Sequence, residues 1–138
     1  MRRVSLQSLL TVIALPLLAA CQSGTDAGDG ISVPGDNSAL STMERIAVAA
    51  QKCWFGEPRP GFEGLAMSPE LTSFSGKPRI LAVPRGNVGG LPKLVVEATG
   101  KPARVAIYGP LMAGPHAAAI DADTRRWAAG GTACSGSA

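Results

Sequence analysis

The stretch Leu91–Tyr108, LPKLVVEATGKPARVAIY, decides the fold because one tight turn joins two strand-like segments. In Leu91–Ala98 and again in Pro102–Tyr108, every second side chain is apolar, which is the period of a strand with one buried face. The turn at Thr99–Lys101 is too short for a crossover, so the two strands must pair antiparallel. We therefore expect a sheet with one face on a core and the other toward water.

The segments around this hairpin predict an α+β domain. Further strands are expected at Gly61–Met67, Glu70–Phe74 and Arg79–Val83. Apolar residues at helical spacing predict one helix at Asn37–Trp54 and another at Pro115–Ala128. We expect a single small domain over residues 37–138, in which an N-terminal helix precedes a three- to five-stranded antiparallel meander. The C-terminal helix would then pack on one sheet face beside the first.

Composition narrows the class of protein. The chain of 138 residues is one domain long, and its net charge of +3 includes Arg2 and Arg3 at the extreme N-terminus. Without these two arginines the charges nearly balance, so nucleic-acid binding is not expected. Aromatic residues make up only 4% of the chain. We therefore expect Trp54, Phe55 and Phe62 to fill the core rather than form an exposed recognition surface.

The N-terminal twenty residues have the pattern of an export signal. Met1–Arg3 is positively charged, and Leu9–Ala20 is an apolar run too short to span a bilayer as a helix. Residues 1–20 are therefore predicted to be a signal peptide. The following tract, QSGTDAGDGISVPGD, is rich in Gly, Ser and Asp, so residues 21–36 are predicted to be a flexible tether that starts with a cysteine.

The junction Leu18-Ala19-Ala20-Cys21 resembles the lipobox of bacterial lipoproteins. The resemblance implies a diacylglyceryl thioether on Cys21, cleavage before it, and acylation of the new amino group. Several acyl chains hold a protein stably at a membrane, whereas one does so only marginally. By the same resemblance, Gln22 in place of Asp favours the outer membrane. The alternative is ordinary cleavage nearby, with Cys21 free or paired.

The other two cysteines are expected to pair. The chain has three cysteines; Cys53 closes the first predicted helix, and Cys134 lies just after the second. An exported chain with two cysteines in its folded part favours a disulfide. The alternative is two free buried thiols or one reactive thiol.

Neither catalysis nor cofactor binding is indicated by any motif. His116 is the only histidine, and at a helix start it is expected to be solvated rather than a catalytic base. No ligand set for zinc or another metal is apparent. One charge asymmetry stands out, because only Glu97 opposes six basic residues: Lys77, Arg79, Arg85, Lys93, Lys101 and Arg104. They are a candidate basic face for an anionic partner; the alternative is scattered solvated charges at strand ends.

A wider resemblance covers most of the predicted domain. The segments KCWFG (Lys52–Gly56), PELTSFSGKPRILAVPRGN (Pro69–Asn87), YGPLM (Tyr108–Met112) and RWAAGGTAC (Arg126–Cys134) resemble small uncharacterised alphaproteobacterial lipoproteins. This resemblance implies a location and no catalytic residues. We expect a non-enzymatic binding or structural module of the cell envelope, facing the periplasm. Its expected partners are the membrane, through Cys21, and an envelope protein or anionic envelope component. The alternative is an envelope enzyme or an enzyme inhibitor acting on cell-wall glycan or on a hydrolase.

Overall fold

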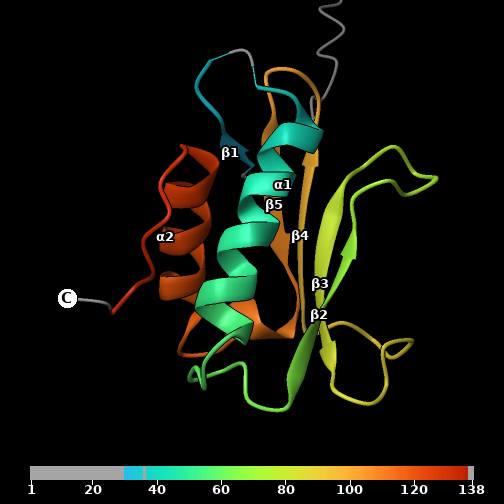
Figure 1. Ribbon diagram of the computed structural model, residues 1–138, viewed down its shortest axis with the longest axis vertical. Coiled ribbons are helices and arrows are strands. Elements are labelled where there is room, and N and C mark those ends of the chain that lie inside the picture. The colour runs from blue at the N-terminus through green and yellow to red at the C-terminus, as the bar shows by residue number, and fades with distance from the viewer. Residues whose placement is uncertain (1–29, 36, 137–138) are drawn as a thin grey trace, which may run out of the picture.

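The computed structural model describes residues 30–35 and 37–136 and forms two layers (Figure 1). One layer is a five-stranded antiparallel sheet of spatial order β1-β5-β4-β3-β2. Its strands are β1 (Ile31–Ser32), β2 (Leu65–Glu70), β3 (Arg79–Pro84), β4 (Leu94–Thr99) and β5 (Arg104–Tyr108). The strands β2 to β5 follow one another as a meander, so the predicted α+β fold is confirmed.

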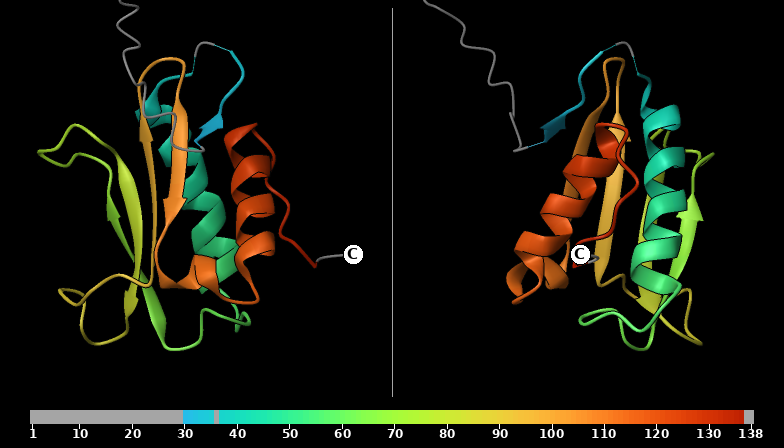
Figure 2. Two further views of the ribbon diagram at one scale, coloured as in Figure 1. Left: turned by 180° about the vertical axis from the view of Figure 1, so that it is seen from behind. Right: turned by 60° about the vertical axis from the view of Figure 1, so that its left-hand side comes forward.

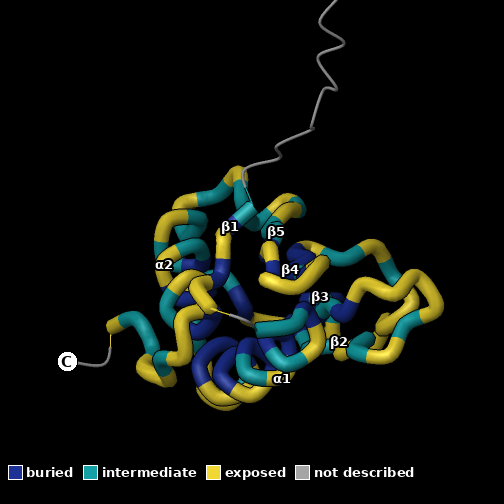
Figure 3. The backbone as a smooth tube through the Cα atoms, turned by 90° about the horizontal axis from the view of Figure 1, so that it is seen from above, coloured by how far each residue is buried: buried dark blue, intermediate teal, exposed yellow. Residues whose placement is uncertain are grey.

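The second layer consists of two helices. The helix α1 (Ala39–Ala50) continues into one π-helical turn, η1 (Gln51–Phe55), and the short 3-10 helix η2 (Pro110–Ala113) precedes α2 (Ala117–Ala128). The two helices lie side by side against the same face of the sheet (Figures 2 and 3). Their apolar stripes meet the inward-facing side chains of the strands, and this is where burial is deepest.

The alternation in β3, β4 and β5 determines which residues enter the core. The buried set shared by sheet and helices includes Ile80, Ala82, Leu94, Val96, Ala98, Val105, Met43, Ile46, Ala50, Ile120 and Trp127. The intervening side chains of the strands point to the other face, which we call the outer face. Among the described residues, no helix packs on the outer face (Figure 3).

The sheet begins earlier in the chain than expected. Ile31 and Val33 are buried, and Ile31–Ser32 pairs antiparallel with β5. The predicted boundary of the domain at residue 37 is therefore wrong, since part of the expected tether belongs to the fold. The Gly-, Ser- and Asp-rich composition of this tract predicted a tether throughout. Two apolar residues, spaced as in a strand, are nevertheless enough to cover the edge of a sheet within a polar tract.

A single strand replaces the two weak strands expected at Gly61–Met67 and Glu70–Phe74. The strand β2 runs through Pro69, and the chain then turns before β3 begins at Arg79. Proline cannot donate a hydrogen bond to a neighbouring strand, but β2 is an edge strand and can accommodate it.

The predicted disulfide is confirmed. Cys53 in η1 is bonded to Cys134, which follows α2, with the two Cα atoms 5.3 Å apart. Beside it, the indole of Trp54 stacks on the ring of Phe62 at a centroid distance of 4.9 Å, and both side chains are buried as expected. The bond joins η1 to the segment after α2, and the aromatic stack joins η1 to the loop that leads into β2.

The predicted signal peptide, the lipidation of Cys21 and the tether up to residue 29 lie outside the described residues. Within the part that is described, no helix combines the length and hydropathy needed to cross a bilayer.

Candidate functional site

The six basic residues singled out from the sequence lie at two ends of the sheet. Arg85 and Lys93 lie in the loop between β3 and β4, and the Arg85 guanidinium donates to the carbonyl of Leu65 at 3.2 Å. The other four lie toward the opposite end, on or beside the turns that join β2 to β3 and β4 to β5: Lys77, Arg79, Lys101 and Arg104. The structure therefore places four of the six basic residues at one end of the sheet and the other two, Arg85 and Lys93, at the opposite end.

A row of charges crosses the outer face and balances Arg79. In the strand register, Arg79 lies between Glu70 and Glu97. Its guanidinium forms an ion pair with Glu70 at 2.6 Å, and this hydrogen bond raises the pKa of Arg79 above its usual value. Glu97 accepts a hydrogen bond from the hydroxyl of Tyr108 at 3.1 Å. The centre of the outer face is therefore mixed in charge rather than basic.

An apolar row runs beside this charged row. Leu81, Val95 and Tyr108 are neighbours in register across β3, β4 and β5. Val95 is only 5% exposed although no described helix covers it, while Tyr108 is 45% exposed. The outer face thus exposes the ring of Tyr108 and part of Leu81 next to charged groups, whereas Val95 is buried.

The ionisation of the Tyr108 phenol can be measured without overlap from another tyrosine, because Tyr108 is the only tyrosine in the chain. Burial, then the hydrogen bond to Glu97 and then the charge of Glu97 raise the pKa of Tyr108 above 10.0. We expect the phenolate absorbance at about 295 nm to appear with a midpoint above pH 10. A group whose pKa is raised on folding favours the folded state below its unfolded pKa, and this contribution is lost as the pH rises through the folded pKa.

Glu97→Gln tests which groups cause this shift. The variant removes a negative charge but keeps the side-chain shape, so the midpoint should fall and still remain above 10, since burial is the largest cause. The matched control is Glu63→Gln on the exposed loop before β2, which should leave the midpoint unchanged. A midpoint at or below 10 in the unmodified protein would contradict the described environment.

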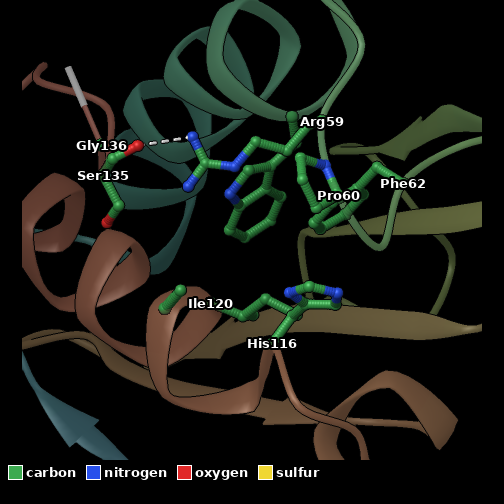
Figure 4. A pocket seen from close by; sticks show the side chains of 9 residues that line it. Arg59, Pro60, Phe62, His116, Ile120, Ser135 and Gly136 are labelled. Atoms are coloured by element: carbon green, nitrogen blue, oxygen red, sulfur yellow. Dashed lines mark hydrogen bonds between the residues drawn. The ribbon is translucent and has the colours of Figure 1, made fainter.

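Apart from the outer face, the molecule has a cavity of about 520 Å³ (Figure 4). It lies between the loop after η1, the start of α2 and the C-terminal segment. Its floor is apolar and consists of the buried side chains of Trp54, Phe62 and Ile120. Its polar lining comes from Arg59, His116 and Ser135.

Behind the floor of the cavity, the side chain of Asp123 connects several segments of the chain. It is fully buried and accepts hydrogen bonds from the Trp54 indole at 3.1 Å and the Ser135 backbone N–H at 2.9 Å. It also pairs with Arg126 at 2.7 Å and with Arg59 at 3.4 Å. The Ser135 hydroxyl donates to the same carboxylate. One carboxylate thus joins η1, α2, the loop before β2 and the C-terminal segment.

His116 borders the cavity without a catalytic partner. The imidazole lies against Gly61, so close that a Cβ at that position would be 2.6 Å from the ring. Among the described residues it makes no hydrogen bond, and the only hydroxyl in the cavity lining, that of Ser135, donates to Asp123 instead. No nucleophile–base pair is assembled in this part of the chain. Likewise, the described residues contain no group of three His, Cys, Asp or Glu side chains placed to hold a metal ion.

Together, the fold and the two sites define a two-layer α+β domain with one disulfide, an uncovered sheet face and a cavity on the helical side. No protein-family model, curated protein or solved structure matches the chain.

Proposed function

We propose that this protein is a lipid-anchored module of the bacterial cell envelope, facing the periplasm from the outer membrane, that binds a partner protein through its outer sheet face. The observation that carries the proposal is that both helices cover one face of the sheet and leave the outer face uncovered. Such a face, with an apolar row beside charged groups, has the composition of a protein–protein interface.

The charges on the outer face favour a protein over a polyanion as partner. At the strand positions of the outer face the charged residues are two arginines and two glutamates, namely Arg79, Arg104, Glu70 and Glu97, so their charges balance. The edges of the sheet favour binding through the face as well. The strand β1 has only two residues, and β2 contains Pro69, so neither edge offers a long run of free backbone donors for an added strand.

The anchor and the compartment are supported by two separate features. The lipobox-like sequence ending at Cys21 accounts for the one cysteine that the disulfide does not use. The disulfide itself is the kind of bond that persists in an oxidising compartment such as the periplasm.

Photocrosslinking in living cells tests the proposal. Tyr108→p-azidophenylalanine places the reactive group on the outer face with little change in shape. We expect one discrete product of larger mass in the membrane fraction. Val48→p-azidophenylalanine is the control, because Val48 is 75% exposed on α1, on the other side of the molecule. Equal crosslinking from both positions, or none from position 108, would refute binding through the outer face.

Protein purified from the same cells also tests whether Cys21 carries the lipid anchor. The mature protein should begin at residue 21 and carry the mass of the acyl chains, whereas Cys21→Ser should accumulate as the longer, uncleaved chain. Intact-mass spectrometry that finds an unmodified thiol at residue 21 would refute the anchor without affecting the crosslinking result.

A further inference from the structure

The cavity beside Trp54 is held in shape by contacts within the protein. The Cys53–Cys134 bond fixes the C-terminal segment that forms one wall, and the Arg59 guanidinium donates to the Ser135 carbonyl at 2.7 Å (Figure 4). Its volume of about 520 Å³ lies within the range of small-molecule sites. A ligand would therefore enter a preformed site, which lowers the ordering cost of binding.

The cavity has an excess of positive charge. None of its lining residues is acidic: Trp54, Arg59, Pro60, Phe62, His116, Ala119, Ile120, Ser135 and Gly136. Behind the floor, two arginines share the single carboxylate of Asp123, and Arg126 is the closer of the two. Arg59 is thus the less compensated cation. Glu57 and Glu63 line a separate, neighbouring depression that also borders Arg59.

Polar groups remain available on two sides of the cavity. A guanidinium has five N–H donors, and the hydrogen bonds from Arg59 to Ser135 and Asp123 leave some unused on a side chain that is 21% exposed. His116 lies across the cavity from Arg59 (Figure 4), and its imidazole makes no hydrogen bond with the described residues. The surface between them is mostly apolar.

We propose that this cavity binds a small carboxylate with an aromatic body. One surplus positive charge at Arg59 matches one carboxylate, with His116 as a second hydrogen-bonding group. A phosphate dianion would keep an uncompensated charge against apolar walls, which is costly. The aromatic body would lie between Pro60 and Ile120, above the floor formed by Phe62. This site is separate from the outer sheet face and does not depend on the proposed function.

Nuclear magnetic resonance of the full ¹⁵N-labelled chain in detergent micelles tests this assignment. The Trp54 indole N–H is the reporter, because it donates to Asp123 directly behind the floor. The probes are naphthalene-2-carboxylate and its uncharged analogue naphthalene-2-carboxamide. We expect the carboxylate to half-saturate the shift of this signal at a concentration at least about tenfold lower than the amide, the equivalent of about 1.4 kcal/mol. Inorganic phosphate should leave the signal in place.

Three variants make the test specific to the cavity. Ala119→Phe fills the cavity from α2 and should abolish the response, whereas Ala122→Phe, on the exposed side of the same helix, should leave it intact. Arg59→Gln should reduce carboxylate binding about tenfold, to the level of the amide. The assignment is overturned if the two naphthalene probes bind equally or not at all, if phosphate binds as well as the carboxylate, or if Ala119→Phe responds like the unmodified chain.

Discussion

Replacing Cys53 and Cys134 together by alanine should lower the free energy of unfolding by about 4–5 kcal/mol. The bond spans 81 residues along the sequence, so its loss frees most of the described domain in the unfolded state. The effect is a large share of the total stability of a small domain, which is about 5–15 kcal/mol. Urea denaturation followed by tryptophan fluorescence measures it, since Trp54 is next to Cys53 and buried.

Reduction offers an independent check on the same bond. The unmodified protein in dithiothreitol should unfold at the urea concentration that unfolds the alanine double variant, and dithiothreitol should have no effect on that variant. The cavity should respond too, because Cys134 holds the segment that supplies Ser135. A double variant as stable as the oxidised protein would mean that the bond contributes nothing to the folded state.

The sequence was sufficient to predict the layers of this fold because its patterns are local. Alternation in Leu91–Tyr108 determined which side chains face the core, and helical spacing located both helices to within a few residues. Local patterns failed where a long-range contact decides the structure. The strand β1 forms only because β5 offers an unpaired edge to Ile31–Ser32, and nothing within residues 22–36 reveals that edge.

The basic residues show a second limit of sequence reasoning. Arg79 is six residues from the nearest cation on its C-terminal side, Arg85, yet the two lie at opposite ends of the sheet because the whole of β3 runs between them. Conversely, Glu70 is remote from Arg79 in the local charge count but faces it across the strand pair. Charge counted along a chain does not predict charge on a sheet face, because strand pairing determines which residues become neighbours.

Asp123 could have been found from the sequence. It lies three residues after Ile120 and four before Trp127, so it falls on the apolar stripe of α2, where a charged side chain must be paired if it is buried. Asp121, two residues earlier, falls on the exposed face and pairs with Arg125 at 2.6 Å. Spacing alone would therefore have been enough to separate the buried carboxylate from the solvated one. Its partners on three other segments could come only from the tertiary structure.

Asp123→Ala should lower the free energy of unfolding by about 3–5 kcal/mol, the cost of breaking a buried ionic network. The variant leaves the buried Trp54 indole N–H without an acceptor and places Arg59 and Arg126 together without a counter-charge. The C-terminal segment also loses two hydrogen bonds at Ser135. Near-ultraviolet circular dichroism should show weaker tryptophan bands, and urea denaturation gives the energy.

Asp121→Ala is the matched control, because it makes the same substitution two positions away on the same helix. It removes an ion pair whose side chains are largely solvated, and such pairs contribute about 0–1 kcal/mol. The difference between the two variants therefore isolates the effect of burial and of the additional partners of Asp123. If both variants lose the same stability, the network behind the cavity floor does not hold the four segments together. In that case the disulfide, the aromatic stack and the hydrogen bond from Arg59 to the Ser135 carbonyl must fix the cavity walls.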